Sequence, residues 1–135
     1  MSKEIDKSKL GQRNKRKGST IERYYAKFFR DTGVEAFSHC KTSRMGSKLH
    51  DDAGIDLIFL PFNVQIKAGI QKGMKPIEEL RLMKEKMKEF FPDKSIEHDL
   101  PKIVIHYKDV GKGKKRTEFD EVVTMTFSDF CKLID

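Results

Sequence analysis

Cysteine, tryptophan and long apolar segments are scarce or absent in this sequence. The two cysteines among its 135 residues, Cys40 and Cys131, are far apart, which excludes a disulfide framework and a cysteine-rich zinc site. No segment approaches the roughly 20 apolar residues of a membrane-spanning helix. The first residues, MSKEIDKSKL, are too polar for a secretory signal. We therefore expect free thiols, no membrane partner and a cytoplasmic location, in the host cytoplasm if the protein is viral.

Positive charge is in excess. Lysine and arginine number 28 against 21 acidic residues, which gives a formal net charge of +7. Such a balance favours a polyanionic partner, with nucleic acid ahead of an anionic membrane. Hydrophobic residues make up 37% of the chain, enough for the core of one domain.

The basic excess is concentrated at the start of the chain. Lysine and arginine dominate residues 1–18, and apolar residues there are too sparse for a core. We expect a flexible basic arm over 1–18 that orders on nucleic acid, with a solubilising tail as the alternative. Residues 19–135 then form a single domain.

Apolar periodicity predicts a mixed α/β or α+β domain with a central sheet. The expected elements are a helix over 19–32, a strand over 34–40, a polar basic loop over 41–50, a hairpin over 55–68, a helix over 76–91, strands over 102–107 and 118–126, and a short helix after Thr126.

The hairpin carries the polar residues that indicate chemistry. Side chains alternate along a strand, so Gln65 and Lys67 share one face while Ile66 points into the core. On the neighbouring strand, Asp56 can reach the same face. A carboxylate and an amide oxygen suit Mg²⁺, which prefers oxygen ligands. The metal can activate water for attack on a phosphate, and a nearby lysine can stabilise the developing charge.

The order Gly54-Ile55-Asp56 and then Gln65-Ile66-Lys67 resembles the signature of the PD-(D/E)XK nucleases. Residues 16–23, RKGSTIER, resemble the opening of archaeal-type Holliday junction resolvases, and the resemblance covers about residues 13–69. It implies a restriction-endonuclease-like core, a central mixed sheet flanked by helices. It also implies a homodimer that cuts four-way DNA junctions.

The resemblance also assigns roles to individual residues. Asp56, Gln65, Glu22 and the backbone carbonyl of Ile66 would hold Mg²⁺, for which Mn²⁺ can substitute, and Lys67 would be the catalytic lysine. Two positions depart from the pattern: Gln65 stands where an acid is usual, and Ile55 stands for the named proline. An amide oxygen lacks charge, so metal affinity should fall.

Basic and polar residues outside the hairpin are candidates for phosphate contacts. They are Arg13, Lys15, Arg16 and Lys17 in the arm, Ser43, Arg44 and Lys48 in the loop before the hairpin, and Lys112, Lys114 and Lys115 in the loop after residue 110. Asp51 or Asp52 could help a second metal.

Several alternatives remain open. Ser19-x-x-Glu22 is a capping box by itself, which would give Glu22 a structural role. Lys67 could be an ordinary edge-strand lysine, and Gln65 could bond within the sheet. The domain could also be a non-catalytic nucleic-acid-binding module on a nuclease fold, or a nuclease of linear or nicked duplex DNA.

Overall fold

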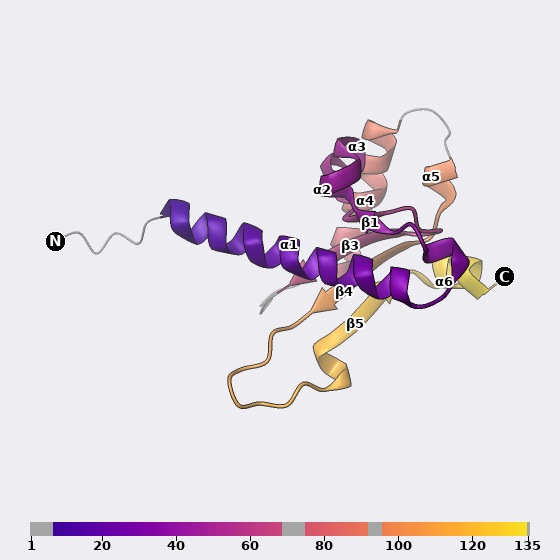
Figure 1. Ribbon diagram of the computed structural model, residues 1–135. Coiled ribbons are helices and arrows are strands. Elements are labelled where there is room, and N and C mark those ends of the chain that lie inside the picture. The colour runs from indigo at the N-terminus through magenta and orange to yellow at the C-terminus, as the bar shows by residue number, and fades with distance from the viewer. Residues whose placement is uncertain (1–6, 69–74, 92–95, 135) are drawn as a thin grey trace.

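The computed structural model describes residues 7–68, 75–91 and 96–134, with the backbone alone for 7–18, 96 and 97 (Figure 1). The elements in chain order are helix α1 (Lys7–Asp31), the 3-10 turn η1 (Glu35–Phe37), strand β1 (Lys41–Thr42), helices α2 (Ser43–Gly46) and α3 (Lys48–Asp52), strands β2 (Leu57–Ile58) and β3 (Asn63–Ala68), helices α4 (Pro76–Phe90) and α5 (Ile96–Asp99), strand β4 (Lys102–Tyr107), the 3-10 turn η2 (Glu118–Asp120), strand β5 (Glu121–Met125) and helix α6 (Phe127–Ile134).

The strands form one mixed sheet in the order β1-β2-β3-β4-β5. Strands β3 and β4 are parallel, and every other neighbouring pair is antiparallel. Helices pack against this sheet, so the predicted mixed α/β class is confirmed. No helix in the described part of the chain is both long and apolar enough to cross a membrane.

Each face of the sheet has its own core. Ile103 and Ile105 of β4 pack with residues of α1, whereas Val104 packs with residues of α4. Successive strand residues point to opposite faces, so α1 and α4 lie on opposite sides of the sheet. Val64 and Ile66 of β3 belong to the α1 side. Gln65 and Lys67 therefore lie on the α4 side.

Four predicted elements agree closely with the structure. Leu57 pairs with Val64 in the antiparallel hairpin of β2 and β3. Helix α4 and strand β4 have nearly the predicted bounds, and a short helix follows Thr126.

Four predictions differ from the structure, three of them in the N-terminal half of the chain and one in the last strand. The first helix begins at Lys7, not at Ser19, and its first part projects beyond the sheet in Figure 1. The predicted strand over 34–40 is wrong, because local bonds such as Phe37 N–H to the Val34 carbonyl form a 3-10 turn there. The predicted strand over 118–126 begins only at Glu121, since Thr117 and Asp120 close a capping box.

The loop predicted over 41–50 is also wrong. It contains β1 and the short helices α2 and α3. The Ser47 hydroxyl accepts the His50 N–H at 3.3 Å and so caps α3. The Ile55 N–H donates to the His50 carbonyl and so links α3 to the residues just before β2.

Met83 and Leu82 allow a direct test of the core under α4. Met83 is 2% exposed, whereas its neighbour Leu82 is 43% exposed. We expect Met83→Ala to lower the free energy of unfolding by about 2–5 kcal/mol and Leu82→Ala to lower it by about 0.5 kcal/mol. Urea unfolding measures both values, and equal losses would contradict the packing of α4 on β4.

Candidate active site

Asp56 is held by backbone bonds on three sides at the entrance to β2. Its N–H donates to the Val64 carbonyl at 2.7 Å, and its carbonyl accepts the Ser43 N–H at 2.9 Å. Its side-chain Oδ2 accepts the Ile66 N–H at 2.7 Å. Gly54 provides the turn before it, with a φ of 82° that favours glycine. The hairpin therefore fixes both the backbone and the carboxyl group of Asp56.

The Asp56 carboxyl is unusually easy to protonate. Its pKa is raised from 3.8 to about 7, and burial is the main cause. The negative charges of Glu22 and Asp51 act in the same direction, while the Ile66 N–H and the charge of Lys67 act against it. These influences place Glu22, Asp51 and Lys67 within electrostatic range of Asp56.

Glu22 enters the same region from α1. Its side chain is buried and forms a two-point ion pair with Arg44, with Nε 2.9 Å from Oε2 and Nη2 3.1 Å from Oε1. Burial raises the Glu22 pKa, and the charge of Arg44 opposes this shift. Because α1 runs continuously through Ser19, the capping-box interpretation of Glu22 is wrong.

Lys67 and Gln65 lie on the opposite side of the hairpin from the α1 core. Lys67 Nζ is 3.6 Å from Oε2 of Glu79 in the first turn of α4. The Gln65 Oε1 atom is buried and has no hydrogen-bond partner in the described part of the chain. The amide nitrogen lies near Gly54, where a Cβ atom would come within 3.4 Å of it. The Gln65 side-chain oxygen is therefore a buried hydrogen-bond acceptor that no described residue satisfies.

Asp51 joins the site through a helix that sequence reasoning did not find. Its Oδ1 accepts the Ser43 hydroxyl at 3.4 Å, and its charge acts on both Glu22 and Asp56. The sequence signal was the Ser47 cap, which starts the helix that carries Asp51. Ser43 itself is fully buried, so its predicted contact with nucleic acid does not fit its position.

His106 and Glu79 were also missed. His106 is the register partner of Lys67 on the parallel strand β4, so both side chains lie on the α4 side. It is 6% exposed, and neither ring nitrogen has a partner among the described residues. Burial is the main cause that lowers its pKa. Only the parallel pairing of β3 with β4, which the sequence does not reveal, places it there.

The remaining predicted contact residues are dispersed. Arg44 forms an ion pair with Glu22. Lys48, Lys112, Lys114 and Lys115 are exposed, and the last three lie on a long connection that projects from the sheet in Figure 1. Arg13, Lys15, Arg16 and Lys17 belong to the backbone of α1, and their side chains lie outside the described residues.

The donors near Asp56 fit a hard divalent cation by chemistry. The available atoms are the carboxylates of Asp56 and Glu22 and the unsatisfied Oε1 of Gln65. The carbonyl and the N–H of one strand residue point to the same side of the strand. Because the Ile66 N–H donates to Asp56, the Ile66 carbonyl also points to the side of β3 where Asp56 lies. Among the described residues, no three or more histidine, cysteine, aspartate or glutamate side chains form a group that could hold a metal ion.

Comparisons with known proteins gave no match to a family model, a curated protein or a solved structure.

Replacing Asp56 with asparagine should stabilise the metal-free protein in alkaline solution. Folded Asp56 keeps its proton where the unfolded chain has lost it, so this carboxyl reduces stability as pH rises from about 4 to about 7. Asparagine stays neutral and keeps an oxygen for the Ile66 N–H. At pH 8, Asp56→Asn should raise the free energy of unfolding by up to about 4 kcal/mol, at about 1.4 kcal/mol per pKa unit. At pH 4 it should change little.

The exposed neighbour Asp52 provides the control. Urea unfolding with EDTA at pH 4, 6 and 8 would compare Asp56→Asn and Asp52→Asn with the unmodified protein. If both variants follow the unmodified protein at pH 8, Asp56 is an ordinary carboxylate.

Proposed function

We propose that this protein is a Mg²⁺-dependent endonuclease that hydrolyses DNA phosphodiesters and acts on branched DNA such as four-way junctions. The observation that carries the proposal is a partly buried carboxyl, Asp56, bonded to the strand that holds Gln65 and Lys67. Partial removal of these polar groups from water is costly unless partners satisfy them, and a functional site is one way to satisfy them. The unsatisfied Gln65 oxygen supports the same interpretation.

The arrangement of elements supports the restriction-endonuclease-like core implied by the PD-(D/E)XK resemblance. Helix α1 precedes β1, β2 and β3, which is the helix–strand–strand–strand order that such a core requires. Glu22 comes from that helix, Asp56 from the entrance to β2, and Gln65 and Lys67 from β3. Their positions in the fold thus follow the order of the sequence motif.

The residues have distinct roles in this proposal. Asp56, Glu22, Gln65 and the Ile66 carbonyl would hold Mg²⁺, or Mn²⁺ in its place. Bound there, the metal supplies a Lewis acid that polarises a phosphoryl oxygen and lowers the pKa of water. Asp56 must lose its proton to act as a ligand. Lys67 orients the attacking water and stabilises charge on the phosphate.

Two ion pairs must open for these roles. Lys67 leaves Glu79, and Glu22 leaves Arg44. The Lys67–Glu79 pair is partly exposed on both sides, and such a pair contributes little to stability. Glu22 is buried, so its separation from Arg44 is costly unless the positive charge of the metal replaces that of the arginine. Arg44 is then available for a DNA phosphate, as the sequence predicts.

A homodimer is part of the proposal, because cutting opposed strands of a junction needs two sites. Strand β5 lies at the edge of the sheet. Together with α6 it carries exposed apolar side chains: Val122, Val123, Phe127, Phe130, Leu133 and Ile134. An exposed apolar edge of this kind favours association with another chain, which supports self-association.

A non-catalytic DNA-binding module is the second candidate. It is favoured by the two ion pairs, which neutralise Lys67 and Glu22 within the chain. Gln65 also brings no negative charge for a metal. This candidate predicts binding to junctions without cleavage in Mg²⁺ or Mn²⁺.

Cleavage of a mobile four-way junction in Mg²⁺ tests the first candidate. Asp56→Asn and Lys67→Ala should each lower the cleavage rate by at least about 100-fold, the scale of losing one charge-stabilising group. Lys86→Ala, an equal loss of charge on α4, should leave the rate nearly unchanged. The cut positions on all strands and the rate on the isolated linear arms would be measured in parallel.

The outcomes separate the candidates. Equal cleavage by all variants would rule out the assigned residues. Tight binding without any cut would favour the binding module. Equal rates on junction and linear arms would replace the branched substrate with duplex DNA.

The metal role of Gln65 has its own test. Gln65→Glu adds a negative charge and should tighten Mg²⁺ binding by about tenfold, or 1.4 kcal/mol. Gln65→Met has a similar size but no oxygen and should weaken it. Calorimetry at pH 8 measures both affinities, and unchanged values for both variants would exclude Gln65 as a ligand.

A further inference from the structure

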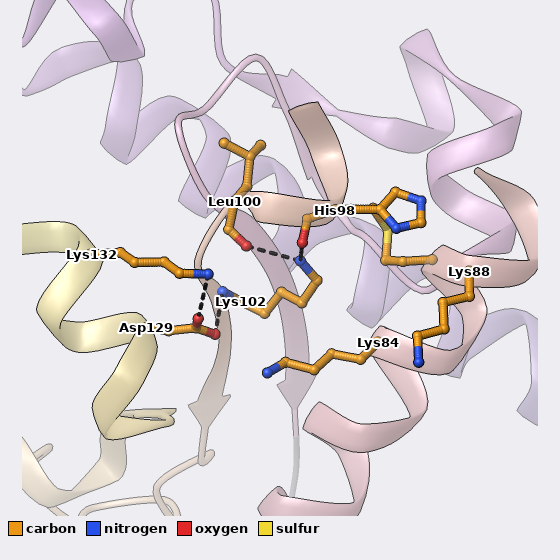
Figure 2. Close-up of a pocket in the computed structure, with 8 residues that line it drawn as sticks. Lys84, Lys88, His98, Leu100, Lys102, Asp129 and Lys132 are labelled. Carbon is orange, nitrogen blue, oxygen red and sulfur yellow. Dashed lines mark hydrogen bonds and ion pairs between the residues drawn. The ribbon is translucent and has the colours of Figure 1, made fainter. Parts of the chain in front are cut away.

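A pocket of about 150 Å³ lies between α4, α5, the start of β4 and α6 (Figure 2). Its charged lining consists of Lys84 and Lys88 from α4, Lys102 from β4, and Asp129 and Lys132 from α6, with His98 beside them. We call it the lysine pocket. Among the described residues, four ammonium groups and one carboxylate give it a charge of about +3 before histidine is counted.

The floor of the lysine pocket is a built structure. Lys102 is 2% exposed, and its ammonium donates to the carbonyls of Leu100 at 2.9 Å and His98 at 3.2 Å. Keeping a buried ammonium charged requires such partners. The two carbonyls therefore hold one positive charge at the base of the pocket.

The Asp129 carboxylate in the described lining already has partners. Asp129 is buried, and its Oδ2 accepts the Lys102 N–H at 3.1 Å. Its Oδ1 is 3.5 Å from Lys132 Nζ. These two contacts offset the charge of Asp129. The carboxylate therefore positions Lys132 and leaves the positive charges of Lys84 and Lys88 without compensation from it.

Lys84 and Lys88 complete the rim from successive turns of α4. In Figure 2 the Lys84 side chain extends toward Lys102 and Asp129. Neither lysine forms an ion pair with any other residue that the structure describes. Like charges gathered around one pocket repel one another, and a multivalent anion relieves that repulsion.

We propose that the lysine pocket binds a phosphate group. Pockets for organic ligands of drug size span about 300–1,000 Å³, so this smaller pocket suits a compact anion. Lysine ammonium groups bind phosphate as point charges. The phosphate belongs either to a small free anion or to a nucleic-acid strand, and the chemistry at the pocket is the same.

The lysine pocket is separate from the candidate active site. Lys102 begins β4, whereas His106 lies four residues further along it, beside Lys67. That separation is about 13 Å at 3.3 Å per strand residue. The proposal therefore stands independently of the nuclease assignment.

Binding measurements in EDTA test the proposal without any requirement for catalysis. The Lys84→Ala/Lys88→Ala variant removes two charges from exposed positions of the rim. Its matched control is Arg81→Ala/Lys86→Ala, which removes the same charge from the same helix outside the pocket. The probes are pyrophosphate, measured by calorimetry, and a short DNA duplex at low salt, measured by fluorescence anisotropy.

We expect the rim variant to lose at least tenfold more affinity than the control for one of these probes. Selective loss for pyrophosphate assigns the pocket to a small free anion, and selective loss for DNA alone assigns it to a strand phosphate. Equal affinities of the two variants for both probes would overturn the proposal. This result would leave the junction-cleavage test unaffected, because cleavage depends on Asp56 and Lys67.

Discussion

The hydrogen bond from the Ile66 N–H to the Asp56 carboxylate is the contact on which the arrangement of the site depends. It fixes the entrance of β2 against β3, and thereby holds the Asp56 carboxyl beside the strand that carries Gln65 and Lys67. The same bond holds a carboxyl in a partly buried position, where ionisation is opposed by the loss of surrounding water and by neighbouring acids. A group held at such a cost is typical of functional sites.

Compensating contacts surround this partly buried acid. Arg44 offsets Glu22, Ser43 donates to Asp51, and Glu79 offsets Lys67. The resulting structure keeps its charges close together while leaving the Gln65 oxygen and the His106 ring without partners among the described residues. At the other end of β4, Lys102 and Asp129 support the lysine pocket by similar contacts. One strand thus connects two polar regions through the apolar Val104.

Sequence patterns predicted the elements whose apolar periodicity is clear. The hairpin, α4 and β4 were found because their alternating or helical apolar positions coincide with burial in the two cores. Residues 34–40 and 41–50 were mispredicted because short turns and helices there are stabilised by individual bonds, such as the Ser47 cap, and not by a repeated pattern. The helical start of α1 was missed because residues 7–18 have few apolar positions.

The sequence by itself determined that Gln65 and Lys67 share a face, since strand alternation is a local property of the backbone. It also determined the basic charge balance and the presence of Asp56 before the hairpin. Only the tertiary structure decided which side chains meet them. Asp51, Glu79 and His106 reach the site through α3, α4 and the parallel β3–β4 pair. Such contacts depend on how distant segments pack, which no local pattern in the sequence encodes.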